Sequence, residues 1–302
     1  MAMASRNTFM GYCRANGAVG VRDYLLALPS VVCATRAAAR AIDGIPHAVT
    51  VEHPVGCAQI GADREQTLRV LVGIGSHPNV RGCAVLGLGC EGVPAAEVRD
   101  GILLCARAAE VVTIQSCGGT EKAAMCAGQL LKEWGRSLSS RDEVSLSRLM
   151  LGIGPIEGLG AAGREIVEAF LERGGSVLGV SAPGSSGFAY GERFVGAGQR
   201  TVMQGGSGPS ETITGLVASG SQIILAQADG QNLGGHPIAP VVRLGYEERL
   251  QMALHDDMDG MIGDRSAEGW VDWILEVASG RHTMAEAEGV LSFAISRVGP
   301  TL

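Results

Sequence analysis

Three cysteines, Cys33, Cys57 and Cys90, each stand at or just past the end of an apolar run. If those runs are neighbouring parallel strands, the three thiols lie along one edge of one sheet, where open α/β sheets bind ligands. Thiolates bind iron, zinc or iron–sulfur clusters, and three of them leave one position for substrate or water. A Lewis-acid catalyst requires such an open position. Because the spacing is too wide for a local metal-binding motif, buried free thiols are an alternative of equal weight.

Three other side chains near these cysteines or near the first strand could take part in chemistry. His53 stands four residues before Cys57 and could be a metal ligand or a general base, or a structural histidine. Glu91 follows Cys90 and could transfer protons, or could cap a turn. Arg22 could pair with a substrate carboxylate because arginine offers bidentate geometry, and the alternative is a surface arginine.

Further candidates follow later apolar runs. Gly118, Gly119 and Thr120 stand between a predicted strand and a predicted helix and could hold an anion at the helix N-terminus, although they form no P-loop or GxGxxG motif. The acidic group at 256–259 could bind a hard cation or form a solvated turn. Cys117 also stands at a strand end, and as a fourth ligand it would make the cysteine set a closed structural zinc site.

The elements that must position these residues alternate between strand and helix. Apolar runs predict strands at 24–33, 48–52, 84–88 and 111–115, and helical spacing predicts helices at 34–42, 63–74, 95–108 and 121–134. Such repeats indicate a parallel sheet with crossovers. Residues 9–22 form a turn-rich entry with a tight turn at Asn16-Gly17.

The polar, serine-rich stretch 135–147 predicts a boundary between two domains. Beyond it, strands are predicted at 149–153, 176–180, 201–203 and 222–226, and helices at 161–173, from 211, at 270–278 and at 284–289. We therefore predict an α/β protein of two units with mainly parallel sheets and flavodoxin- or Rossmann-like layering. An N-terminal domain at 1–140 carries the cysteine site, and a C-terminal domain occupies 147–302.

Composition narrows the class of protein. Of 302 residues, 46% are hydrophobic, only 4% are aromatic and 45 are glycine, as in an α/β protein with many tight loops. The net charge of −7 speaks against a nucleic-acid partner, and no apolar run reaches the length of a membrane span. Eight cysteines without a signal peptide read as free thiols or metal ligands in a reducing compartment, so we expect a cytoplasmic protein. We also expect a homo-oligomer.

Several stretches together match the motifs of one enzyme family. The opening GYCRANGAVGVRDY at 11–24 is similar to the pattern G-x-x-R-x-D-G-R-V-G-T-R-N-Y, and later matches stand at Cys33, His53, 56–57, 77–80, 87–91, 211–216, 237–241, 256–259 and 277–280. The chain thus resembles the altronate/galactarate dehydratase family, which includes the large subunit of sulfolactate sulfo-lyase. Most of the chain takes part in the resemblance.

The resemblance implies a metal-dependent lyase that eliminates water, or sulfite, from a hydroxy or sugar acid. On this reading Cys33, Cys57 and Cys90 hold iron, as Fe²⁺ or an iron–sulfur cluster, and another divalent cation is an alternative. Arg22 orients the acid, and His53 or Glu91 moves protons. The matched helix start at Glu211 and Thr212, together with 118–120, contributes to substrate binding.

Two departures from the family pattern qualify this reading. Family members carry a small N-terminal domain, fused or as a separate subunit, whereas this chain starts at the large part, so a small partner subunit is implied. The middle of the chain is also shortened, which indicates a substrate other than a six-carbon sugar acid. A non-catalytic family member that binds metal or a partner is the alternative.

Overall fold

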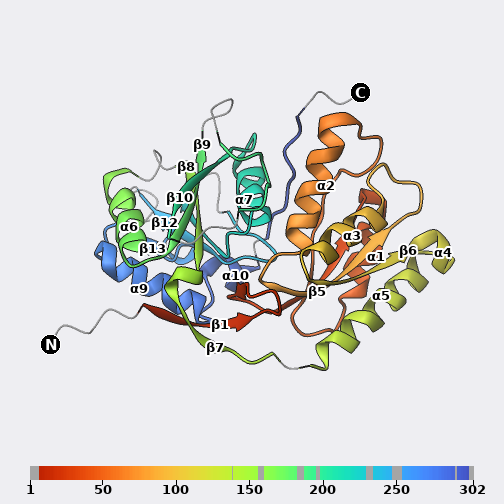
Figure 1. The fold of residues 1–302 in the computed structure, drawn as a ribbon, viewed down its shortest axis with the longest axis horizontal. Coiled ribbons are helices and arrows are strands. Elements are labelled where there is room, and N and C mark those ends of the chain that lie inside the picture. The colour runs from red at the N-terminus through yellow and green to blue at the C-terminus, as the bar shows by residue number, and fades with distance from the viewer. Residues whose placement is uncertain are drawn as a thin grey trace.

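The computed structural model describes residues 7–137, 139–155, 160–181, 187–194, 198–228, 234–246, 254–289 and 291–298. Two parallel sheets with helices on their faces lie side by side, and a small antiparallel sheet runs along the bottom of the view in Figure 1. The predicted α/β class with mainly parallel sheets is confirmed. Among the described residues, no helix is both long enough and apolar enough to cross a membrane.

The first sheet has the strand order β4-β3-β5-β6, and all its pairs are parallel. Its strands are β3 (Tyr24–Pro29), β4 (Ala48–Thr50), β5 (Val80–Gly87) and β6 (Ala108–Thr113). Numbered by their place along the chain, the strands follow the order 2-1-3-4, as in flavodoxin-like sheets. In such sheets the ligand crevice lies at the carboxyl ends of the first and third strands, which here are β3 and β5.

Alternation along β3 explains the helical layers of this first unit. Successive side chains of a strand point to opposite faces of the sheet. Leu25 and Ala27 belong to a core cluster with residues of α1 (Thr35–Ala41) and α5 (Thr120–Gly135). Leu26 and Leu28 belong to another cluster with residues of α2 (Gly61–Gly75) and α3 (Ala95–Leu104). The sheet is therefore buried on both faces, as a parallel sheet requires.

The second sheet has the order β10-β9-β8-β11-β12-β13, again with every pair parallel. Along the chain this is 3-2-1-4-5-6, the order of Rossmann folds. The strands are β8 (Met150–Pro155), β9 (Ser176–Ser181), β10 (Arg200–Gln204), β11 (Ile223–Ala228), β12 (Val241–Gly245) and β13 (Gly260–Met261). The first unit thus has a flavodoxin-like and the second a Rossmann-like strand order, the two layerings that the sequence offers as alternatives.

Three helices cover this second sheet. Phe170 of α6 (Gly160–Glu172) and Trp270 of α9 (Ala267–Ala278) pack in one core cluster. Leu216 of α7 (Pro209–Ala218) belongs to the cluster that also contains α2 residues of the first unit. The short elements are η1 (Val32–Ala34), α4 (Ile114–Cys117), η2 (Leu146–Arg148), η4 (His255–Asp257) and α10 (Met284–Glu288).

The small antiparallel sheet differs from the sequence expectation. The predicted turn-rich entry forms β1 (Thr8–Cys13) and β2 (Val19–Gly20), which are joined by a turn in which Gly17 has φ 79°. The expected linker contains β7 (Asp142–Ser145), which pairs with β1. Phe9 of β1 packs in the core of the second unit. The domain boundaries at 140 and 147 stay a prediction, although β1 packs with the second unit rather than the first.

Buried polar side chains and a helix pair fix the two units against each other. The Asn79 side chain accepts a bond from the Val21 N–H (2.9 Å) and donates to the Gln222 and Ile238 carbonyls (3.1 and 2.9 Å). Helices α2 and α7 lie side by side between the sheets in Figure 1. They approach closely because Gly73 has no side chain that would meet the α7 backbone. Residues at the junction are therefore held in one arrangement.

Candidate active site at the edge of the first sheet

The three loops that carry the predicted cysteines meet at the carboxyl edge of the first sheet. The N–H of Val32 donates to the Val55 carbonyl (3.0 Å), and the N–H of Gly92 donates to the Gly56 carbonyl (3.0 Å). Each of Cys33, Cys57 and Cys90 therefore lies within two residues of a bond between loops. Because Cys33 and Cys90 follow β3 and β5, they flank the point where the strand order reverses, which is where open α/β sheets bind ligands.

Two glycines allow this close approach. Gly56 has φ 98°, and a Cβ there would overlap the Ser30 carbonyl oxygen. A Cβ at Gly87 would overlap Oε1 of Glu91. Glycine is tolerated where a left-handed conformation or a tight backbone approach is needed, so both glycines contribute to the assembly of the edge.

The three thiols share an edge but do not form a ligand cluster. All three are exposed free cysteines. Thiols are suitable donors for iron or zinc, so their chemistry and common edge fit a thiolate-bound metal. In the part of the chain that the structure describes, however, no three His, Cys, Asp or Glu side chains lie close enough together to hold a metal ion. The backbone thus brings the loops together while the side chains stand apart, and metal binding stays a prediction.

Glu91 is held as a carboxylate at the centre of this edge. Its Oε2 accepts a bond from the Gly89 N–H (2.6 Å), and its Oε1 lies 3.4 Å from both the Ser30 hydroxyl and the Ala95 N–H. Burial alone would raise the pKa of Glu91, but the backbone N–H groups outweigh it and hold the pKa below its usual value. At neutral pH this group is therefore ionised and can accept a proton.

His53 stands in the first unit but is buried. Its Nε2 lies 2.8 Å from the Pro29 carbonyl, and since a carbonyl only accepts, Nε2 carries a proton. Burial lowers the pKa of His53, so the ring is neutral at pH 7. The ring packs 6.0 Å from that of Phe293, which also lies 5.7 Å from the His236 ring. His53 supports the end of β3 and, in this arrangement, is covered rather than open to a substrate.

Arg22 lies at the opposite end of the sheet from the cysteines. It forms a bidentate pair with Glu286 of α10 (2.7 Å for both bonds) and donates its other N–H groups to the carbonyls of Val21, Val277 and Arg281 (2.8 to 2.9 Å). All five donors are used. β3 has six residues, so roughly 20 Å separate its two ends. From this position Arg22 is not expected to contact a substrate carboxylate at the cysteine edge. Its bonds instead connect the first unit to the segment that contains α9 and α10.

Gly118, Gly119 and Thr120 lie at the same edge as the cysteines, beyond β6. Gly118 and Gly119 have φ of 78° and 130°, and Gly119 caps α5. A Cβ at Gly119 would meet nothing within 4 Å, so the helix N-terminus is open. Burial and a hydrogen bond with Cys126 raise the pKa of the neighbouring Cys117 thiol. Cys117 thus lies beside Cys126 of α5, and its role as a fourth ligand of a closed zinc site stays a prediction.

Glu211 and Thr212 lie in the first turn of α7, at the carboxyl edge of the second sheet. Thr212 is buried, and the Glu211 carbonyl accepts the Tyr190 hydroxyl. The chain at 291–298, which we call the C-terminal strap, runs between α7 and α2: Ser296 bonds Ser207 before α7 (3.1 Å) and Gln66 of α2 (2.5 Å). The strap therefore links the two sheet edges. Substrate binding by Glu211 and Thr212 stays a prediction.

Within the acidic group at 256–259, Asp259 has a structural role. The Asp259 carboxylate accepts the backbone N–H of Arg243 (2.8 Å) and of Met284 (3.1 Å). Burial raises the pKa of Asp259. The η4 residues before it include no buried side chain. The Asp259 oxygens are thus used to join α10 to β12.

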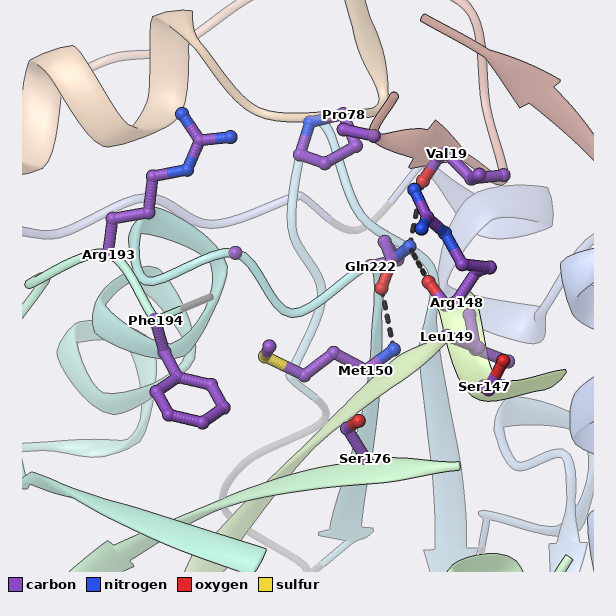
Figure 2. A pocket seen from close by; sticks show the side chains of 12 residues that line it. Val19, Pro78, Ser147, Arg148, Leu149, Met150, Ser176, Arg193, Phe194 and Gln222 are labelled. Atoms are coloured by element: carbon purple, nitrogen blue, oxygen red, sulfur yellow. Dashed lines mark hydrogen bonds between the residues drawn. The ribbon is translucent and has the colours of Figure 1, made fainter. Parts of the chain in front are cut away.

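A hollow of about 390 Å³ also opens at the junction of the two units (Figure 2). Figure 2 shows the Gln222 side chain bonded to the carbonyls of Val19 and Arg148 (2.7 and 2.9 Å) and to the N–H of Met150 (2.6 Å). Phe194 lies across from them. Because all three of these bonds join separate segments, Gln222 ties the two units together at this hollow.

Three residues that support the edge were missed in the sequence. Ser30, fully buried, lies 3.4 Å from Glu91, and Gln59 accepts the Gly56 N–H (3.0 Å). Arg64 donates to the Gly92 carbonyl (2.8 Å) and pairs with Glu97. Their positions, one directly after a strand and two near the start of a helix, could have indicated such a supporting role.

The fold and this edge define an α/β protein with three thiol-bearing loops at a topological switch point. Two family models match the chain: "D-galactarate dehydratase/Altronate hydrolase, second domain" at residues 11–139 and "D-galactarate/Altronate dehydratase, C-terminal" at residues 181–301. Together the two matches cover most of the chain. The chain belongs to the altronate/galactarate dehydratase family.

Individual relatives differ in how much they share. The altronate dehydratase of Bacillus subtilis is 33% identical over 159 residues, which are 48% of this chain and 31% of that protein. The altronate dehydratase of Escherichia coli is 35% identical over 112 residues, 33% of this chain and 22% of that protein. The match thus spans a third or less of these relatives.

The (2R)-sulfolactate sulfo-lyase subunit beta of Chromohalobacter salexigens is 26% identical over 382 residues, 96% of this chain and 97% of that protein. Because this alignment is longer than the 302-residue chain, the relative contains residues that this chain lacks. That difference agrees with the shortened middle that the sequence indicates.

Proposed function

We propose that this chain is the catalytic subunit of a lyase that eliminates water, or a comparable leaving group such as sulfite, from a small hydroxy acid. The observation that carries the proposal is the meeting of three thiol-bearing loops with the Glu91 carboxylate at the switch point of the first sheet. The family and the near-complete alignment with a sulfo-lyase subunit support it.

In such an elimination the C–H bond beside the carboxylate and the C–O bond on the next carbon break, and a C=C bond forms. Glu91 is the group that would accept the proton, because its backbone bonds keep it ionised and fixed. Return of that proton to the departing hydroxyl gives water and an unsaturated acid, so the atoms balance. Ser30 and Arg64 act as positioning residues, since they hold Glu91 and the following loop.

Cys33, Cys57 and Cys90 are the residues that would hold the metal, with iron as the first candidate and another divalent cation as the alternative. When bound, the metal supplies Lewis acidity for the negative charge that develops on the substrate carboxylate. The low pKa of Glu91 makes it a weak base, so the reaction needs this help. The open N-terminus of α5 at Gly119 and Thr120 is placed to attract an anionic group of the substrate.

A small partner subunit and a homo-oligomer complete the proposal. The relative that aligns along its whole length is named a subunit, which supports a multi-subunit enzyme. The shortened middle of this chain favours a substrate smaller than, or different from, a six-carbon sugar acid.

The test is anaerobic purification with iron supplied, followed by metal analysis and an assay for an unsaturated or keto product from a panel of hydroxy acids. We expect bound iron and activity with the small subunit added, and loss of both in Cys90→Ala. Cys105→Ala is the matched control, because Cys105 caps the far end of α3, and it should retain iron. A preparation that stays metal-free and inert with its partner would overturn the proposal and favour a non-catalytic role.

A further inference from the structure

A cleft of about 620 Å³ opens at the amino end of the first sheet, opposite the cysteine edge. Its walls come from the start of β3 and β5, the loop before β4, the end of α5 and the segment after α9. Because β3 has six residues, roughly 20 Å separate the cleft from the cysteines. Its volume is in the range of small-molecule sites, and the proposed reaction leaves it without a role.

The cleft is positively charged although the whole chain has a net charge of −7. Four cationic side chains line it besides the neutralised Arg22: Arg81, Lys132, Arg136 and Arg141. Asp23 is the one carboxylate among the described residues that line the cleft. Its carboxylate lies 2.6 Å from the guanidinium of Arg14, which does not line the cleft, and 3.5 Å from that of Arg81. The other three cations have no ion-pair partner among the described residues.

Two of the guanidinium groups are positioned by carbonyls, and the carboxylate near Arg81, that of Asp23, lies closer to Arg14. Arg141 donates to the Ser279 carbonyl (2.6 Å) and lies over the Tyr12 ring at 5.0 Å. Arg81 donates to the Ser137 carbonyl. Carbonyls and rings orient a guanidinium but do not cancel its charge, so these groups are fixed and still able to bind an anion.

A neighbouring groove between α1 and α5 shows the contrast. It shares Lys132 and Arg136, but Asp43, Glu121 and Glu133 line it as well. Three carboxylates there match three cations, Arg40 included, so the excess of positive charge in the cleft rests on Arg81 and Arg141, which the groove does not share. The cleft is therefore the anion site of the two.

We propose that this cleft binds a small polyanion, a molecule with two or more phosphate or carboxylate groups, at a site separate from the reaction edge. Four cations around one cleft, two of them held in place by hydrogen bonds, favour a ligand with several negative groups over a single-charge ion. The exposed imidazoles of His47 and His282 add hydrogen-bonding groups at its rim. This proposal is independent of the proposed elimination, because binding of an anion in the cleft is measured without any catalytic turnover.

The experiment is calorimetric titration of the full-length chain with pyrophosphate and, separately, with citrate at about 50 mM salt. We expect saturable binding of at least one probe with Kd below about 1 mM. Pyrophosphate alone would indicate a phosphate ligand, and citrate alone a carboxylate ligand. Saturable binding of neither probe would overturn the proposal.

A charge-matched pair of double variants locates the site. Arg81→Gln with Arg141→Gln, two residues that line the cleft but not the groove, should weaken binding at least about tenfold, since two charge-assisted contacts are lost. Arg164→Gln with Arg200→Gln removes two exposed arginines of the second unit and should change Kd less than about twofold. Equal weakening in both would show an effect of net charge alone and refute the site. Arg81→Lys with Arg141→Lys keeps both charges and should retain most of the binding, and a wild-type urea midpoint of the neutral double variants excludes a folding artefact.

Discussion

Replacement of Glu286 by glutamine tests whether Arg22 is a structural ion-pair partner. The side chains of Arg22 and Glu286 are only 6% and 8% exposed, and two bonds of 2.7 Å join them. Loss of one partner leaves a buried charge uncompensated, which costs about 3–5 kcal/mol. Glutamine keeps the shape and three carbonyl bonds of Arg22 remain, so we expect the lower end, about 3 kcal/mol. That is a large fraction of a typical stability of about 5–15 kcal/mol.

Urea denaturation of wild type, Glu286→Gln and Arg22→Met measures the free energy of unfolding. Glu276→Gln is the control, because Glu276 pairs with Arg281 at 2.6 Å but both are about half exposed, and it should cost less than about 1 kcal/mol. If Glu286→Gln and Arg22→Met unfold like the wild type while Arg22→Met raises the KM for a hydroxy acid, the structural reading is refuted and Arg22 binds substrate.

The same pair predicts a pH dependence. Burial alone would raise the pKa of Glu286, but the hydrogen bonds and charge of Arg22 outweigh it and hold the pKa below the usual 4.5. A carboxyl whose folded pKa is depressed stabilises the protein above its unfolded pKa, and this stabilisation is lost as pH falls through the folded value. The wild type should therefore lose more stability than Glu286→Gln as pH drops below about 4.5. Parallel losses would contradict this.

Three further changes test the junction and the edge. Asn79→Ala should lower the unfolding free energy by about 3 kcal/mol in urea, because buried groups of three segments lose their partner; a loss under about 1 kcal/mol would contradict this. Gly56→Ala places a Cβ against the Ser30 carbonyl, and we expect about 2 kcal/mol of destabilisation together with a reduced iron content. An unchanged iron content would show that metal binding does not depend on the contact between these loops. Cys117→Ser should leave iron content unchanged by metal analysis, since the proposed site uses the thiolates of Cys33, Cys57 and Cys90 alone; metal loss would favour the four-cysteine site.

Local patterns were sufficient to predict most elements. Apolar runs located β3 and β5, and helical spacing located α2 within about two residues of each observed end. The shared edge of Cys33, Cys57 and Cys90 also followed from the chain, because strands of a parallel sheet all end on the same side. The pattern could not reveal β1 and β7, since their pairing joins segments more than 130 residues apart.

By itself, the sequence determined the α/β class, the strand-and-helix order and the family, because these depend on residue types and on repeats along the chain. Only the tertiary structure decided which side chains meet. Arg22 and Glu286 are 264 positions apart, and the Phe293 ring reaches His53 from the end of the chain. Such contacts arise from packing between distant segments, which no local period encodes. For that reason Arg22 could be taken for a substrate-binding residue, and the polyanion cleft could not be seen before the fold.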